Sequence, residues 1–586
     1  MTLDSAESQR QAQVQPSTPL PEVMGSRWMV AAGHPLAAQA GAKILQAGGN
    51  AVDAGVAAGL CLGVVHSDMV SMAGVAPIMV HLAKRRETHT VAGVGPWPRA
   101  ASIEFFRERC AGQIPEGILR TVVPAAPDAW CTALERWGTM SFAEVAAPAI
   151  ECAERGFPLS PFSAMLIRQS EAKHRRWPSN AAIYLPEGRP LGAGERLVQA
   201  ELAQTLKEMA HQERRAQRLG RARAIRAARD AFYTGAIAEA ISAYHRREGG
   251  LLTREDLAEF RVEVGPPLTT RFGVFEVAAC GFWCQGPALL QTLNLLGSFD
   301  LASLGHNSPD YLHLLIEAIK LTFADRDAYY GDPAQVKVPT DGLLSESYAR
   351  ARRTLIGERA WPDLPPAGDP FGLSALRNGA GRSADRPTGE PGPFDTSYVA
   401  VVDAEGNGFS ATPSDPSVDS PVVPGVGCVI SPRGSQSWLD PGHPGAVSPG
   451  RRPRLTPNPA MVFRDGRLFM PFGTPGGDVQ VQAMLQVFLN VALFGMSPQE
   501  AVEAPRVATR SFPDSFWPHA SFPGLVNVEG RIPAAVAEKL TALGHTVHAW
   551  PDREWRAGAV CAIVAGEDGI KRAGADPRRS SHAIGW

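Results

Sequence analysis

The sequence predicts a mixed protein of the α+β class, in which helices and strands follow one another along the chain. Short apolar runs bounded by turn residues indicate buried strands, and apolar residues at three- and four-residue spacing indicate helices. The chain has 586 residues, of which 44% are hydrophobic, and this is ample length to bury a core. The expected strands span residues 28–32, 76–82, 87–94, 398–402 and 468–472, and the expected helices span residues 35–47, 51–65, 142–155, 198–246, 311–330 and 479–494.

The N-terminal part predicts a tail, a strand and two helices. Residues 1–25 carry neither a basic start nor an apolar stretch, so we expect a disordered tail rather than a signal peptide. Gly48 and Gly49 end the first helix. The second, at 51–65, is almost wholly apolar and rich in alanine and glycine, so it must be buried on every side and can pack closely.

Two charged regions lie in the middle of the chain. Arginines are dense between residues 214 and 229, a pattern that would suit nucleic acid, but the interspersed acidic residues favour a solvated helix. The helix at 311–330 carries Glu317, Lys320, Asp325 and Arg326 among mostly core positions. These four charges could act in catalysis, and we favour instead a buried ion network.

The junction at Thr396 is the stretch that carries most information about function. Residues 355–394 are rich in Pro, Gly and Arg and show no periodicity, which is typical of a linker. Thr396 follows and opens the strand expected at 398–402. A chain cut before Thr396 would carry a free α-amine beside the hydroxyl, the base and nucleophile of an N-terminal threonine hydrolase. The alternative is a strand that simply starts with a β-branched residue.

Charge and cysteine usage exclude several classes of protein. A net charge of -2 argues against a general nucleic-acid-binding protein and favours a small-molecule or peptide partner. The eight cysteines lack metal-binding spacing and are expected to be free thiols. His34, His66, His313 and His443 also lack zinc spacing. No segment offers the roughly 20 uninterrupted apolar residues of a membrane span, so we expect a soluble, cytoplasmic protein. We also expect it to use no metal and no organic cofactor.

Six motifs accompany the junction Asp395-Thr396-Ser397-Tyr398, in one order along nearly the whole chain. They are Gly48-Gly49-Asn50-Ala51-Val52-Asp53-Ala54, Glu317-Ala318-Ile319-Lys320 with Ala324-Asp325-Arg326, Gly331-Asp332-Pro333, Pro475-Gly476-Gly477-Asp478, Glu503-Ala504-Pro505-Arg506 and Asp576-Pro577-Arg578. With them the chain resembles the γ-glutamyltranspeptidase family, whose members cut themselves before that threonine.

The resemblance implies an N-terminal nucleophile fold, a four-layer αββα sandwich of two antiparallel sheets flanked by helices. It also implies a large subunit, residues 26–395, which ends in the linker at 355–394. The small subunit, residues 396–586, would begin with the nucleophile. The two fragments would form a heterodimer, and two heterodimers could associate further.

The resemblance assigns the bond-making chemistry to four residues. Thr396 would be the nucleophile, with its α-amine as general base, and Ser414 would hydrogen-bond it. Gly476 and Gly477 would offer two backbone amides as an oxyanion hole, a role that suits glycine because its backbone can approach the substrate closely. Without the resemblance, residues 473–477 are only a glycine-rich loop, and the missing Walker lysine argues against a nucleotide site.

The positions that would hold a γ-glutamyl head differ from the family's pattern. Ile103 replaces the arginine that grips the α-carboxylate, and an apolar side chain cannot pair with a carboxylate. Arg99 and Arg107 lie nearby in sequence, although such arginines are more often on the surface. Gln436 replaces the acidic residue that takes the α-amine. Further replacements are Leu455 and Thr456 for paired serines and Pro416 for an asparagine.

Arg433 stands where the family often has a neutral amide, and it could hold a carboxylate from another side of the pocket. The substrate-binding candidates are therefore Arg433, Gln436 and Thr456. Residues 437–445 make a shorter connection than in lid-bearing transpeptidases, as in the lidless branch of acylases and amide hydrolases. A lidless pocket admits water, which favours hydrolysis over transfer.

We therefore expect a self-processing N-terminal threonine amidohydrolase that cleaves a small amide or acyl-amide through an acyl-Thr396 intermediate. Two alternatives stay open. One is a true γ-glutamyltransferase or glutathione hydrolase that uses a replacement anchor such as Arg433 or Arg99. The other is a catalytically inactive relative that acts as a binding protein.

Overall fold

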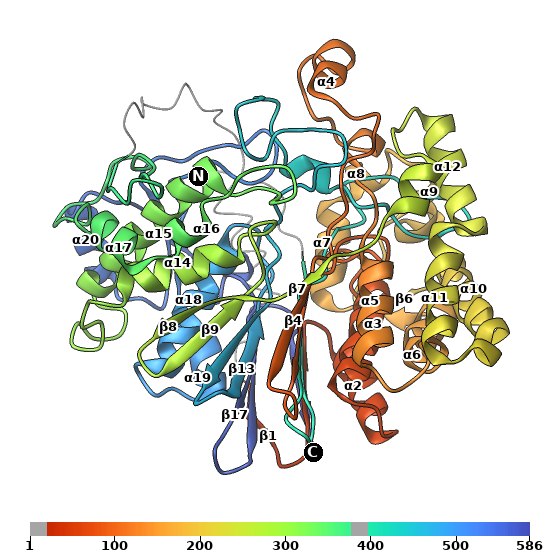
Figure 1. Ribbon diagram of the computed structural model, residues 1–586, viewed down its shortest axis with the longest axis horizontal. Coiled ribbons are helices and arrows are strands. Elements are labelled where there is room, and N and C mark those ends of the chain that lie inside the picture. Colours follow the sequence, from red (N-terminus) through yellow and green to blue (C-terminus); the bar gives the residue numbers. More distant parts are fainter. Residues whose placement is uncertain (1–19, 377–395) are drawn as a thin grey trace.

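The computed structural model describes residues 20–376 and 396–586. Its centre consists of two facing seven-stranded sheets, and helices cover the outer face of each (Figure 1). The strand orders are β1-β18-β17-β13-β12-β9-β8 and β19-β2-β10-β11-β3-β4-β7. Neighbouring strands in both sheets are antiparallel. The expected four-layer αββα sandwich is thus confirmed.

The first sheet contains β1 (Val23–Gly25), β8 (Leu268–Phe272), β9 (Phe275–Ala279), β12 (Ala460–Arg464), β13 (Arg467–Gly473), β17 (Cys561–Ala565) and β18 (Lys571–Ala575). The second contains β2 (Met29–Ala32), β3 (Ile78–Leu82), β4 (Glu87–Val91), β7 (Val264–Gly265), β10 (Val399–Val402), β11 (Gly408–Ala411) and β19 (His582–Gly585). Two small sheets lie outside this pair: β14 (Val507–Thr509), β15 (Leu525–Glu529) and β16 (Thr546–Trp550), and β5 (Phe157–Pro158) with β6 (Arg196–Leu197).

Two groups of helices form the outer layers. The group that shares a core with the second sheet contains α2 (Pro35–Gln46), α3 (Ala51–Val65), α5 (Ala126–Trp137), α6 (Phe142–Arg155), α7 (Pro161–Gln169), α9 (Pro178–Tyr184), α10 (Ala200–Ala216), α11 (Arg221–Tyr233), α12 (Ala236–Glu248) and α13 (Arg254–Glu259). The group on the first sheet contains α14 (Gly286–Leu296), α15 (Pro309–Tyr329), α16 (Thr340–Leu343), α17 (Glu346–Arg353), α18 (Val479–Ala492) and α20 (Ala534–Ala542). The remaining helices are α4 (Ile103–Arg109), α8 (Glu171–His174) and α19 (Pro498–Glu503).

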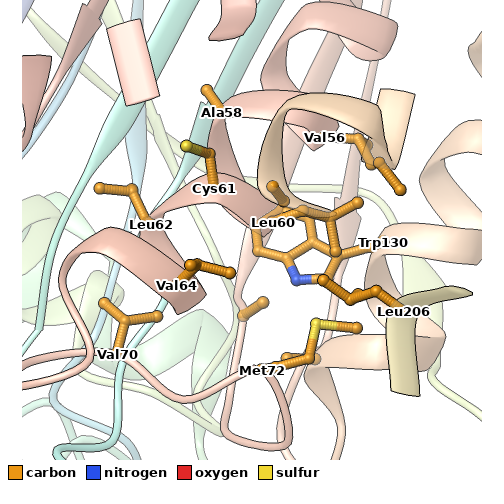
Figure 2. Packing of buried hydrophobic residues seen from close by; sticks show 14 of the residues in the cluster. Val56, Ala58, Leu60, Cys61, Leu62, Val64, Val70, Met72, Trp130 and Leu206 are labelled. Atoms are coloured by element: carbon orange, nitrogen blue, oxygen red, sulfur yellow. The ribbon is translucent and has the colours of Figure 1, made fainter. Parts of the chain in front are cut away.

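Helix α3 is buried at all of its 15 residues, as its composition predicts. Its glycines allow close contact with both neighbouring layers. A Cβ at Gly55 would lie 2.1 Å from the ring of Phe409 in β11, and one at Gly59 would lie 2.5 Å from Trp130 in α5. Figure 2 shows the indole of Trp130 packed beside α3, among Val56, Leu60, Met72 and Leu206. A larger residue at either glycine would force these layers apart.

Three expectations about local structure are corrected. Val23–Gly25 pairs with β18 as strand β1, so the chain is ordered before the predicted end of the tail at residue 25, whereas residues 1–19 lie outside the described residues. The helix expected at 198–246 is three helices, α10, α11 and α12, interrupted at Gly220 and Gly235. The arginine-rich face is only partly solvated, since Arg229 is buried and pairs with Asp128 at 2.8 Å.

The expected ion network on α15 is confirmed, and part of it crosses the proposed cut. Lys320 lies 2.8 Å from Glu317, and Arg352 lies 3.3 Å from Asp325, all fully buried. Arg326 pairs with Asp478, which follows Thr396 in the chain. All eight cysteines are free. Among the described residues, no helix combines the length and hydrophobicity needed to cross a membrane.

Only part of the predicted linker, residues 355–394, lies within the described residues. Residues 355–376 contain neither a helix nor a named strand, and residues 377–394 lie outside the described ranges.

Candidate active site

Thr396 lies three residues before β10, a central strand of the second sheet between β2 and β11. Its side chain is fully buried, and its backbone N–H donates to the carbonyl of Met69 at 3.1 Å. Its φ is 89°, a region that a β-branched residue rarely enters. Such a conformation costs about 1–3 kcal/mol and is often found where strain serves function.

The hydroxyl of Thr396 contacts that of Ser414, the partner that the family resemblance implies. Thr396 Oγ1 lies 2.7 Å from Ser414 Oγ. Arg433 Nη2 donates to Ser414 Oγ, and Arg433 Nε pairs with Asp415. Because a guanidinium can only donate, Ser414 accepts from it and keeps its own hydrogen for Thr396. Ser414 can therefore stabilise negative charge on the Thr396 oxygen.

Gly476 and Gly477 lie in the loop between β13 and α18 with φ values of 126° and 56°. Both angles favour glycine. Asp478, the next residue, fixes this loop because its carboxylate accepts from the backbone N–H and the hydroxyl of Ser515, both at 2.7 Å, and pairs with Arg326. Burial opposes ionisation, but Arg326 and Ser515 outweigh it and lower the pKa of Asp478. The loop is thus held by a buried, charged anchor.

Thr396 and the glycine loop lie at the same end of the sandwich. A Cβ at Gly473, the last residue of β13, would lie 2.4 Å from the ring of Tyr398, two residues after Thr396. Tyr398 is itself fixed by a 2.6 Å hydrogen bond between its hydroxyl and that of Ser410. The start of β10 therefore faces the end of β13 across the two sheets.

Gln436 and Thr456, two predicted substrate-binding residues, are hydrogen-bonded to each other. Gln436 Nε2 donates to Thr456 Oγ1 at 2.9 Å, and Gln436 Oε1 accepts from the Thr456 N–H at 3.3 Å. Gln285 Nε2 donates to the carbonyls of Thr456 and Gly477, both at 3.0 Å. Gln285 thereby joins this pair to the glycine loop.

Phe516 links the glycine loop to Arg433. Its ring edge lies 3.5 Å from the point that a Cβ on Gly477 would occupy. The Arg433 guanidinium carbon lies 5.4 Å from the centroid of the same ring. The Arg433 guanidinium therefore packs over a ring that also borders the glycine loop.

The other candidate anchors lie elsewhere. Ile103 begins α4 and is buried in an apolar cluster with Trp97 and Phe106. Arg99 is exposed and pairs with Glu259, and the exposed Arg107 donates to the carbonyl of Leu439 at 3.2 Å. Both arginines are thus engaged at the surface, as sequence position alone suggested. The replacements Pro416 and Leu455 are buried.

Sequence reasoning missed Asp415, Gln285 and Phe516. Asp415 adopts φ 97° and holds Arg433, but in the sequence it is only an Asp-Pro dipeptide beside Ser414. Gln285 precedes a Gly-Pro pair, which indicates a helix start rather than a bridge between loops. Only the short spacing of Asp415 from Ser414 was a usable signal.

The structure brings together one metal-competent group among the described residues: His313, Glu317 and His545. The two imidazoles lie 2.9 Å apart, from His313 Nδ1 to His545 Nε2, and His313 Nε2 contacts the carbonyl of Gly357 at 2.9 Å. Lys320 Nζ lies 2.8 Å from Glu317 Oε1 and already supplies a buried positive charge there. The spacing of single histidines could not show this cluster, since His545 is remote in sequence.

Comparison with known proteins adds independent findings. A family model described as Gamma-glutamyltranspeptidase matches residues 37–586. The chain is 36% identical to the Acylase ACY 1 proenzyme of Pseudomonas sp. (strain SE83), over 93% of this chain and 91% of that protein. It is 32% identical to the Glutathione hydrolase-like YwrD proenzyme of Bacillus subtilis (strain 168), over 96% and 99%. The structure of cephalosporin acylase from Bacillus halodurans superimposes with a TM-score of 0.84 at 29% identity, covering 97% of this chain and 98% of that one.

Proposed function

Because the chain belongs to the gamma-glutamyltranspeptidase family, we propose that it is a self-processing amidohydrolase whose nucleophile is Thr396. The observation that carries the proposal is the 2.7 Å contact between Thr396 Oγ1 and Ser414 Oγ at the start of β10. Residues 26–395 and 396–586 would be its large and small subunits, as the proenzyme names of the relatives support. Association of two such heterodimers stays a prediction.

Self-cleavage would begin at the strained junction. The Thr396 oxygen attacks the carbonyl carbon of the preceding peptide bond, the C–N bond breaks, and the acyl group moves from nitrogen to oxygen. Breaking the C–N bond frees the α-amine, which takes up the proton of the Thr396 hydroxyl. Water then hydrolyses the ester, which restores that hydroxyl and separates the two chains. The positive φ of Thr396 favours the reaction because cleavage removes the backbone constraint that strains this residue.

The same groups would then hydrolyse the substrate. The free α-amine takes the proton of the Thr396 hydroxyl, and the oxygen attacks the amide carbonyl. The Gly476 and Gly477 amides stabilise the oxyanion, and Ser414 supports the attacking oxygen. The C–N bond breaks as the α-ammonium returns its proton to the leaving amine. Water, deprotonated by the α-amine, finally attacks the ester and releases the acid.

The substrate class proposed is an amide whose acyl group carries at most one negative charge and no amine. Arg433 is the cation beside Ser414. Because Asp415 already neutralises much of its charge, Arg433 should attract a carboxylate of the substrate only modestly. Gln436 is neutral and hydrogen-bonded to Thr456, so it would bind a substrate ammonium group more weakly than a carboxylate side chain would. The acylase names of two relatives support cleavage of an acyl amide.

The test is intact-mass measurement of the purified protein together with an assay on acyl amides. Wild-type protein should give two chains that meet before Thr396. Thr396→Ala should give one chain and no turnover. Thr412→Ala, which truncates another fully buried threonine whose hydroxyl has no hydrogen-bond partner in the described structure, is the matched control and should still be cut. An uncut wild-type chain that hydrolyses amides would refute the assignment.

A further inference from the structure

The turn that holds the nitrogen of Thr396 follows directly after α3. The carbonyl of Met69 accepts from the Thr396 N–H at 3.1 Å. The backbone N–H groups of Met69 and Val70 both bond to the carbonyl of His66, at 2.8 and 2.9 Å. His66 is the residue that caps the C-terminus of α3. The place of the Thr396 nitrogen therefore depends on the turn at residues 66–69.

The side chain of His66 connects this turn to the residue after the nucleophile. His66 Nδ1 lies 3.2 Å from Ser397 Oγ, and His66 Nε2 lies 3.8 Å from Asp68 Oδ2. His66 and Ser397 are both 1% exposed. Gly33 makes room for this contact, because a Cβ there would lie 2.2 Å from Ser397 Oγ. The imidazole thus fills the space between two segments that both touch Thr396.

The groups that face His66 are His34, Asp68 and Arg579. The rings of His34 and His66 lie 5.9 Å apart, and Arg579 Nη1 lies 3.6 Å from Met69 Sδ. Burial, with the charge of Arg579, lowers the pKa of His66 to about 3, so the ring is neutral at pH 7. Burial also raises the pKa of Asp68 to about 6. A neutral ring can hold Ser397 without placing a positive charge near an amine that must accept a proton.

We infer that His66 is a positioning residue for the α-amine of Thr396, acting through Ser397 and the turn at residues 66–69. The inference rests on the proposed function, which makes that amine the general base. Loss of the ring would let the turn and Ser397 shift, and a misplacement of about 1 Å at a reacting group can cost on the order of a hundredfold in rate. It would also weaken the Met69 carbonyl contact that favours the protonated amine.

The experiment compares four full-length variants: His66→Phe, which keeps a ring and loses both nitrogens, His66→Asn, which restores an amide near Nδ1, Ser397→Ala, and His245→Phe. The last replaces another buried histidine, in α12, and is the control for ring substitution. In the cleaved fraction, His66→Phe should lower kcat about tenfold or more with KM unchanged. The acid limb of its pH profile of kcat, which reports the α-amine of Thr396, should move to lower pH by about half a unit or more. His66→Asn should recover most of the loss.

Ser397→Ala should reproduce the effect. A fifth protein, which combines His66→Phe with Ser397→Ala, should show no additive loss, because both changes remove the same hydrogen bond. A wild-type kcat and pH profile in cleaved His66→Phe protein would overturn the inference and leave Thr396 as nucleophile. Turnover by Thr396→Ala would instead contradict the proposed function, because it would show that Thr396 is not the nucleophile. If His66→Phe does not fold, Ser397→Ala decides alone, and a wild-type profile there overturns the inference.

Discussion

The bond-making and the acyl-recognition regions of the candidate site differ in how closely they follow the family's pattern. Thr396, Ser414 and the Gly476-Gly477 pair keep the expected residue types, and each is held by buried contacts. Ile103 and Gln436 depart from the residue types of the family's pattern, and Ile103 lies in an apolar cluster. The chemistry of an acyl bond needs the same groups whatever the acyl chain is, whereas the pocket that selects the chain can be replaced.

Arg433 belongs to both regions, and this makes the comparison informative. It donates to Ser414, beside Thr396, and its guanidinium approaches Phe516 at the edge of the glycine loop. Under the proposed function, a cation placed here would act on the Thr396 oxygen, through Ser414, and on the substrate at once. The two regions are therefore separable in residue type but joined through one side chain.

After the loss of turnover expected from Thr396→Ala, the largest effect is expected in the bond-making region, from Gly477→Val. Gly477 has φ 56°, and Phe516 lies 3.5 Å from its Cβ position, so valine would strain the backbone and displace the amide that we propose as an oxyanion donor. We expect kcat to fall by roughly 10² or more. The measurement is a rate comparison on protein shown to be cleaved and folded.

Gly466→Val is the matched control. Gly466 also has a positive φ, 72°, but lies in the turn between β12 and β13 with open space at its Cβ position. It should lose stability without losing rate in the folded fraction. A near-normal rate for Gly477→Val would remove that glycine from the oxyanion site.

A smaller effect is expected in the recognition region, as a preference between two substrates. A γ-glutamyl anilide and its des-amino analogue, glutaryl anilide, differ only in the ammonium group. Gln436 accepts an ammonium less well than a carboxylate would, so the glutaryl compound should have the higher kcat/KM. If the γ-glutamyl compound is better by tenfold or more, about 1.4 kcal/mol, the glutathione hydrolase alternative replaces our reading of the pocket.

The sequence predicted the elements that carry the site better than the contacts within it. Local patterns predicted α3 and α6 with the bounds that the structure shows, because an almost wholly apolar run and a capped amphipathic run each specify one helix. The pairing of Thr396 with Ser414 came from the resemblance. The contacts through Gln285 and Asp415 could not be predicted, since they join loops that only the two-sheet packing brings together.

The smallest effect is expected from Gln436→Glu, which adds a negative charge to the recognition region without changing its shape. The new carboxylate can still accept from the Thr456 N–H and from its hydroxyl, which can rotate toward it. It should draw the preference toward the γ-glutamyl anilide by about three- to tenfold, or 0.7–1.4 kcal/mol. Burial raises the pKa of a carboxyl group, so the shift should grow as pH rises and the group ionises.

Gln436→Met separates charge from shape, because it fills similar space with neither charge nor hydrogen bonds. It should lower activity on both anilides without changing their ratio in favour of the γ-glutamyl compound. If Gln436→Glu leaves the ratio of the two kcat/KM values unchanged at every pH, Gln436 does not face the α-amine position. The recognition region would then have to be sought on the Phe516 side of Arg433, where the ring and the guanidinium already meet.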